Sequence, residues 1–378
     1  MERTIICDFI DSNESLEFKT FFDTRGTIND PSMILIEDYV GKPVRENTIY
    51  ALNLKALNKL KELNLVNQYL DSYLIGYEIN ASLIEEPIFH TSVSLGKAYL
   101  PTNLSEIEFP LKSIEWPSKS KKSVNVRNVG HGNWNEILFG NLIKIVYDAG
   151  GPLYASKEEI DKIIGNRNIL YPSSKPILIL SHWDKDHYHS LLGMTVEELK
   201  NNFSSFICRS ERPNLTSRLI YGRLLKALGQ KNVYDIVPTE KDIKLNHFSK
   251  CISFGNMITL YNSQYSKDRN NSSLILLIKT RENSILLASD AHYKHLSKDI
   301  LPQLNFKHKH HLVVPHHGGE AGRYLYVIPN LASVGIAAIS IGRNNYKHPN
   351  ENFIESLLQT GFKIFKTNTK PGDIIISL

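Results

Sequence analysis

A short apolar run followed at once by four metal-binding side chains is the feature that most constrains this chain. Residues 177–180 are all aliphatic, which is typical of a strand buried on both faces. The next residues of chemical interest are His182, Asp184, Asp186 and His187. Imidazole and carboxylate groups suit Zn²⁺ or Mn²⁺, and this spacing lets one segment serve two ions. On this segment alone, a polar loop with solvated charges is the alternative.

Three further apolar runs, at 284–289, 311–315 and 334–341, each lead into residues of similar chemistry. The residues that follow them include Asp290, His316, His317, Arg343, Asn345 and His348. In layered α/β folds, ligands bind beyond the carboxyl ends of the strands. The four runs together therefore predict a metal site at one edge of a sheet, and they argue against four unrelated solvated loops.

These motifs resemble those of the metallo-β-lactamase superfamily, which is an αββα sandwich carrying one or two metals. Within that superfamily, the chain is most similar to the nuclease-type domain of bacterial competence DNA-uptake (ComEC-type) proteins. The resemblance covers roughly residues 124–378 and rests on seven stretches in order, at 126–139, 145–151, 180–187, 270–278, 285–292, 313–319 and 340–349. It implies an α/β fold, an αββα metallo-β-lactamase-like sandwich, whereas residues 1 to about 120 show no such resemblance.

The chain departs from the superfamily's usual pattern at several positions. Asp184 stands where most members have His, although the competence-type branch also has Asp there. The usual Gly-Gln-Gly-Asp is replaced by the Gly-His-Gly-Asn of residues 130–133, and the small pair after the Asp-His by Tyr188-His189. His247 is the only His between His189 and His292, and its surroundings are those of an ordinary loop.

The ligand set predicts a pair of divalent ions. We expect His182 and Asp184 to hold one ion and Asp186 and His187 the other, with Asp290 as the bridging carboxylate. One of His316 and His317 completes the set, because two adjacent side chains of an extended strand point to opposite faces. The predicted metal ligands are therefore His182, Asp184, Asp186, His187, Asp290 and His316 or His317.

Residues around this set are predicted to orient it and to contact the substrate. Asp148 is expected to orient the ligand segment, with a simple turn residue as the alternative. His348 and Asp186 are the predicted catalytic residues, and His348 would bind a phosphate oxygen or protonate the leaving group. The predicted substrate-binding residues are Asn271, Ser272, Arg343 and Asn345. The share of carboxylates makes Mn²⁺ a rival to Zn²⁺, and both stay open.

Charge and pattern divide the chain near residue 120. Residues 1–120 hold 18 Asp and Glu against 11 Lys and Arg, a net charge of −7, and the rest hold 21 against 33, a net of +12. We predict a small acidic α/β module over 1–120 and a hydrolase domain over 121–378. The module is expected to have strands at 4–10 and 32–37 and a helix from 47 to about 70. Its role is unknown, and it is a candidate surface for a protein partner.

Periodicity in the second domain predicts helices at 156–164, 194–203, 214–229 and 350–360. Strands are expected near 136–147, 177–181, 257–263, 272–279, 284–288 and 311–315. The cysteines Cys7, Cys208 and Cys251 are widely spaced, which favours a reducing compartment. The chain shows no secretory signal and no apolar run of membrane-spanning length, so we expect a cytoplasmic bacterial protein that does not contact the membrane.

The sequence therefore predicts a metal-dependent hydrolase of phosphodiesters. A nuclease acting on DNA, through a dinuclear site with a bridging hydroxide, is the leading hypothesis, because the resemblance to a nuclease-type branch implies it and a basic domain favours nucleic acid as the partner. One alternative is a metallo-hydrolase of a small ester, lactone or cyclic nucleotide, because fold alone does not select a substrate. Another is a non-catalytic binding protein that keeps the fold.

Overall fold

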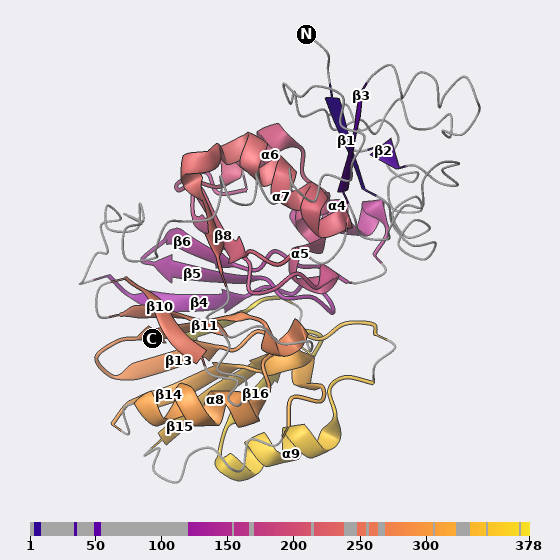
Figure 1. Cartoon of the computed structure of the whole chain (residues 1–378). Helices are drawn as coiled ribbons and strands as arrows, with labels where there is room; N and C mark the ends of the chain where they lie inside the picture. Colours follow the sequence, from indigo (N-terminus) through magenta and orange to yellow (C-terminus); the bar gives the residue numbers. More distant parts are fainter. Residues whose placement is uncertain are drawn as a thin grey trace. The chain divides into compact units, whose positions relative to one another are not determined.

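The fold comes from a computed structural model of the whole chain (Figure 1). It describes three short strands within the first 53 residues and most of residues 120–378. The undescribed parts of that second range are 153–154, 166–169, 213–214, 238–247, 255–256, 264–268, 305–306, 323–332, 345–346 and 370–371. The chain divides into two compact units, one of Met1–Leu100 with Arg212–Lys226 and one of Pro101–Glu211 with Ala227–Leu378. The predicted boundary near residue 120 remains a prediction.

The first unit contains a small sheet in the order β2-β1-β3. Strand β1 (Thr4–Asp8) pairs in parallel with β2 (Ile34–Leu35) and antiparallel with β3 (Ile49–Asn53). The helix predicted from residue 47 is therefore wrong over 49–53, and the rest of it lies outside the described residues. The segment begins Ile-Tyr, residue types that favour strands, and pairing with β1 outweighed the helical spacing. Helix α7 (Leu215–Leu228) agrees with the prediction for 214–229.

The second unit is built on two seven-stranded sheets. The first sheet has the order β17 (Ile374–Ser377), β4 (Lys122–Val126), β5 (Asn135–Phe139), β6 (Leu142–Tyr147), β7 (Ile177–Ile179), β8 (Ser205–Arg209), β9 (Val233–Ile236). The second has the order β10 (Phe248–Phe254), β11 (Ile258–Ser263), β12 (Leu274–Lys279), β13 (Asn283–Leu287), β14 (Lys309–Val313), β15 (Ser333–Ile339), β16 (Lys363–Lys366).

Both sheets change from antiparallel to parallel pairing at a corresponding place. In the first sheet the strands up to β6 are antiparallel, and β6 to β9 run parallel. In the second the strands up to β13 are antiparallel, and β13 to β16 run parallel. The carboxyl ends of the first parallel pair, β6 and β7 or β13 and β14, therefore lie side by side in each sheet.

A core of branched aliphatic side chains joins the two sheets. Ile177 and Ile179 of β7 and Ile285 and Leu287 of β13 belong to it. Leu286 faces the other way, into a second core that packs the second sheet against helices. Strands β7 and β13 are thus buried on both faces, as their apolar runs predicted.

Helices cover the outer faces of the sheets (Figure 1). Helices α4 (Lys157–Ile164), α5 (Lys185–Leu192) and α6 (Val196–Asn202) lie over the first sheet, and α8 (Tyr293–Asp299) and α9 (Glu351–Thr360) lie over the second. Single 3₁₀ turns are η4 (Gln230–Asn232), η5 (Arg269–Asn271), η6 (Leu301–Gln303) and η7 (Pro315–Gly318). The predicted αββα architecture, consistent with a metallo-β-lactamase-like sandwich, is confirmed. Among the described residues, no helix is long and apolar enough to cross a membrane.

The buried imidazole of His310 gives the fold a predictable response to acid. His310 in β14 is fully buried against the Phe362 ring, and burial, aided by His311, lowers its pKa to about 3. In the unfolded chain its pKa is about 6.5. As pH falls below 6.5, His310 therefore takes up a proton in the unfolded state but not in the folded state, and the free energy of unfolding declines.

We expect His310→Gln to remove this contribution. Between pH 7 and pH 5 the wild-type chain should lose about 2 kcal/mol more of its unfolding free energy than the variant does. Urea denaturation of both metal-free proteins at the two pH values measures the difference. An equal loss in both proteins would contradict the account.

Candidate metal centre

Polar side chains that follow the carboxyl ends of four strands lie close together. Strands β6 and β7 of the first sheet lead to Asp148 and His182, and β13 and β14 of the second lead to Asp290 and His316. Each pair comes from the first two parallel strands of its sheet. This is the position at which layered α/β folds bind their ligands.

Asp186 and His187 lie in the first turn of α5 rather than in a loop. The neighbouring segments hold this turn tightly, because the Asn133 amide donates to the Asp186 carbonyl at 3.0 Å. A Cβ on Gly150 would collide with the same carbonyl, so only glycine allows the close approach. The helix start thus fixes both side chains relative to the strand ends.

His182, His187 and Asp290 form one group that could hold a metal ion, with their ligand atoms all within 4.8 Å of one another. The Asp290 carboxylate lies 3.2 Å from His187 Nε2 and 3.9 Å from His182 Nε2. These nitrogens and Asp290 Oδ1 are buried without a hydrogen-bond partner of good geometry. Since buried polar atoms are nearly always satisfied, their convergence fits a bound cation. Asp184 is close by, with a carboxylate oxygen 3.5 Å from His182 Nε2.

His131, Asp186 and His317 form a second such group, again within 4.8 Å. His317 Nε2 lies 3.3 Å from the Asp186 carboxylate, and the His131 and His317 rings are 4.2 Å apart. Burial lowers the pKa of His131 to about 3, with His317 adding to the effect, so its ring is a neutral ligand. His131 was not among the predicted ligands. Its one sequence signal was the replacement of Gln by His in the Gly-x-Gly segment.

The two groups differ from the predicted pairing of ligands. His182 lies with His187, and Asp186 lies with His131 and His317. At 3.6 residues per turn, the neighbouring side chains of Asp186 and His187 point roughly 100° apart around the axis of α5, so each can serve a different group. His247, the candidate considered for a missing ligand, lies outside the described residues.

Both His316 and His317 reach the site, because their backbone is not extended. They lie in turn η7 with left-handed φ values of 53° and 52°. His316 Nδ1 is 2.9 Å from Asp290 Oδ2, whereas His317 Nδ1 donates to the Ser340 carbonyl at 3.1 Å. That hydrogen bond leaves His317 Nε2 available to the second group. The premise that only one of the two could point inward was wrong.

A buried hydrogen-bonded network orients the first group. Asp148 accepts from the Ser181 amide at 2.7 Å and the Ser181 hydroxyl at 2.9 Å, and it lies 2.8 Å from His187 Nδ1. The Ser289 hydroxyl donates to Ser181 at 2.8 Å and lies 3.0 Å from His182 Nδ1. With Nδ1 of each imidazole engaged, the Nε2 atoms face Asp290. Asp148 thus lies where an orienting residue was expected, and the two serines were not predicted.

Charge in the first group also favours a cation. Burial would lower the pKa of His187, but the carboxylates of Asp290 and Asp148 raise it well above the usual range. Burial would likewise raise the pKa of Asp290, but His187, His316 and His182 hold it well below its usual range. The Asp290 carboxylate therefore stays ionised in a buried place and stabilises positive charge there.

His348 lies beside the two groups, with its ring 4.8 Å from that of His316 and 5.6 Å from that of His131. Asn344 fixes its backbone, accepting from the His348 amide at 3.1 Å and donating to its carbonyl at 3.1 Å. Arg343, which lies close to His348 in sequence, is exposed to solvent. Asn344 was not predicted, although it provides the rigid support for a predicted catalytic residue.

The other predicted substrate contacts are less direct. Asn271 and Ser272 are both buried, and Asn271 Oδ1 accepts from the His292 amide at 3.1 Å. That bond ties the segment before β12 to the segment that follows Asp290. Asn345 lies outside the described residues. A substrate-binding role for these three residues remains a prediction.

The sequence matches no known family profile and no curated protein. Solved structures with a similar fold include Tm1679, a metal-dependent hydrolase of the β-lactamase superfamily, at 12% identity over 68% of this chain and 99% of Tm1679, with a TM-score of 0.43. The metallo-β-lactamase-fold protein YhfI from Bacillus subtilis shares 12% identity over 68% of this chain and 99% of YhfI, with a TM-score of 0.39.

A mutant of the β-hydroxylase CmlA is also similar, at 12% identity over 70% of this chain, with a TM-score of 0.39. This chain spans about half of that protein, since the match covers 55% of CmlA. The similar structures thus include metallo-β-lactamase superfamily members, and similarity to the competence-type branch remains a prediction. Because the identities and TM-scores are this low, function has to be inferred from the chain's own residues.

We expect His131→Ala to remove one metal ion while leaving the other. The group of His182, His187 and Asp290 is intact in this variant, whereas the other group loses a third of its ligands. Elemental analysis after dialysis against Zn²⁺ or Mn²⁺ should show a fall from about two ions per chain to about one. His310→Gln, which also removes a buried imidazole, is the matched control. Equal metal content in wild type and His131→Ala would exclude His131 as a ligand.

Proposed function

We propose that this chain is a metal-dependent hydrolase that cleaves phosphodiesters, with DNA as its substrate. The observation that carries the proposal is the pair of adjacent ligand groups on the strand ends, within a strongly basic stretch of chain. Two-metal sites of this kind are characteristic of phosphatases and nucleases.

The donor set fits divalent ions. Four imidazoles and two carboxylates suit Zn²⁺ and Mn²⁺, so the identity of the metal stays part of the proposal. His182, His187 and Asp290 would hold one ion, and His131, Asp186 and His317 the other. When bound, such ions polarise a phosphoryl oxygen and lower the pKa of water to near neutrality.

Hydrogen bonds within the protein hold these donor side chains in position, so that metal binding requires no rearrangement of them. Asp148 and Ser289 hold the rings of the first group, and the Ser340 carbonyl holds that of His317. Burial excludes competing water from most of the donor atoms. Such preorganised polar groups stabilise charge that develops during a reaction better than mobile solvent does.

His348 is suited to contact the substrate. Burial and the neighbouring His316 lower its pKa to about 4, so its ring is neutral at pH 7 and offers one N–H donor. From its place beside both groups it can donate that hydrogen bond to a phosphate oxygen. Exposed Arg343 and Lys347 flank it in sequence and add positive charge, which favours the binding of a phosphate backbone.

The charge of the chain favours a polyanion over a small neutral ester. Residues 121–378 carry a net charge of +12, against −7 for residues 1–120. A positive surface around a metal site steers nucleic acid towards it and makes its binding sensitive to salt. The same positive charge would do little to strengthen the binding of a neutral lactone or thioester.

Hydrolysis assays test the proposal directly. We expect wild-type protein loaded with Mn²⁺ or Zn²⁺ to cleave linear or circular DNA, chelator to abolish the cleavage, and Asp186→Ala and Asp290→Ala to lose at least about 10³-fold in rate. His310→Gln should retain activity. Cleavage that persists in both Asp variants would reveal a contaminating nuclease. No cleavage of DNA, RNA or bis(p-nitrophenyl) phosphate by metal-loaded protein would overturn the proposal.

A second variant tests the role of His348. We expect His348→Ala to lower kcat by about 10²–10³-fold, since one hydrogen bond to the reacting phosphate is removed. Metal content should stay at the wild-type level, because His348 belongs to neither ligand group. A wild-type kcat in this variant, or loss of metal along with activity, would contradict the assigned role.

A further inference from the structure

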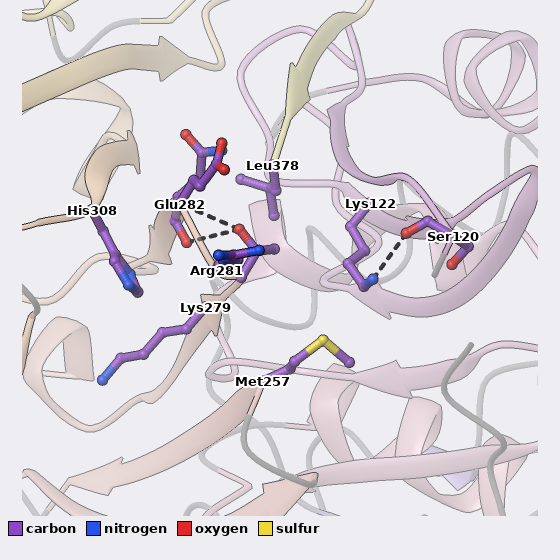
Figure 2. A pocket seen from close by; sticks show the side chains of 10 residues that line it. Ser120, Lys122, Met257, Lys279, Arg281, Glu282, His308 and Leu378 are labelled. Carbon is purple, nitrogen blue, oxygen red and sulfur yellow. Dashed lines mark hydrogen bonds between the residues drawn. The ribbon is translucent and has the colours of Figure 1, made fainter. Parts of the chain in front are cut away.

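A cavity lies away from the metal groups, where β4 and β13 begin. It has a volume of about 490 Å³, which suits a small ligand, and ten residues line it. The lining residues include the turn between β12 and β13 and the start of β4 (Figure 2). Asn283 lines the cavity at the first residue of β13, whereas Asp290 follows the other end of that strand. The five residues of β13 therefore separate cavity and metal groups by roughly 16 Å.

Basic side chains dominate the lining of this cavity. Lys279, Arg281 and His308 lie on one side in Figure 2 and Lys122 on the other, and Glu282 is the single acidic residue of the lining. Within the part of the chain that the structure describes, neither Lys279 nor Arg281 forms an ion pair with a carboxylate. Their charges are thus available to a ligand.

The residues that line the cavity also include a buried ring nitrogen that no described residue satisfies. His308 Nδ1 is buried and has no hydrogen-bond partner among the described residues. An unmet buried polar atom in a cavity is typical of a ligand or water site. Lys279 supports the same view, since burial and the nearby Lys250 lower its pKa, and an anion would relieve both effects.

The turn that presents these charges is rigid. The Asn283 amide donates to Thr280 Oγ1 at 3.1 Å, and the Thr280 amide donates to the Asn283 carbonyl at 2.8 Å. Further backbone hydrogen bonds anchor the turn on both sides, from Lys309 to Glu282 at 2.8 Å and from Lys279 to Met257 at 2.6 Å. Lys279 Nζ donates to the Gln303 carbonyl at 3.1 Å. A preformed site of this kind loses little entropy on binding.

We propose that this cavity binds the phosphate group of a nucleotide-sized ligand, separately from the metal centre. Three cationic side chains and the imidazole of His308 surround a volume of about 490 Å³, with Glu282 as the one acidic side chain, and they match a phosphate-bearing anion in both charge and size. The phosphate can come from a free nucleotide or from a nucleic-acid strand. The site depends on its own residues and not on hydrolysis at the metal groups.

Isothermal titration of the full-length, metal-free protein tests the proposal with three probes: pyrophosphate, ADP and a single-stranded 12-nucleotide DNA. The pocket variant is Lys279→Glu/Arg281→Glu. The control is Lys162→Glu/Lys363→Glu, which makes the same change in charge at exposed residues outside the cavity. Arg281→Gln alone, at an exposed turn position, replaces the double variant if that variant does not fold.

We expect at least one probe to bind the wild type, with an affinity that falls tenfold or more in the pocket variant and less than twofold in the control. If the pocket variant loses binding of pyrophosphate and ADP, the ligand of the cavity is a free nucleotide. If it loses binding of DNA alone, the ligand is a nucleic-acid strand. No binding of any probe, or an equal loss in both double variants, would overturn the proposal. Hydrolysis of bis(p-nitrophenyl) phosphate by the metal-loaded pocket variant should match wild type, which separates this test from that of the proposed function.

Discussion

The buried hydrogen-bonded network of Asp148, Ser181 and Ser289 is the constraint on which the rest of the site depends. Asp148 and Ser181 follow neighbouring strands of the first sheet, whereas Ser289 follows a strand of the second. Tyr147 reinforces the link, since its hydroxyl donates to the Leu274 carbonyl of the second sheet at 2.6 Å. The same network engages Nδ1 of His182 and His187. The bonds that join the sheets therefore also set the direction of the ligands.

Backbone geometry at the strand ends serves the same purpose. Asp148, Ser289, His316 and His317 all have positive φ values, which for residues other than glycine cost of order 1–3 kcal/mol each. Sheet pairing and the buried network hold these conformations in place, and each one turns a side chain sharply from the strand direction towards the centre. Their concentration around two groups of unsatisfied ligand atoms indicates that stability is given up for a preorganised site.

The sandwich fold and five of the six residues in the two ligand groups follow from local patterns in the sequence. Uniform apolar runs predicted the buried strands that lead to His182 and Asp290, because strands buried on both faces leave that signal. Helix α5 was missed, since the metal-binding residues 184–187 resemble a polar loop. His131 and Ser289 could not be predicted as partners of the ligands, because sequence spacing says nothing about contacts across two sheets. The left-handed conformations of His316 and His317 could not be predicted, because residues other than glycine rarely adopt them.

Crystals of the wild-type protein grown with Zn²⁺ or Mn²⁺, and measured at the absorption edge of the metal, test the central claim most directly. The account predicts two anomalous peaks, one among His182, His187 and Asp290 and one among His131, Asp186 and His317. A single peak, or peaks held by other side chains, would contradict the assignment of two ligand groups and with it the proposed two-metal hydrolysis.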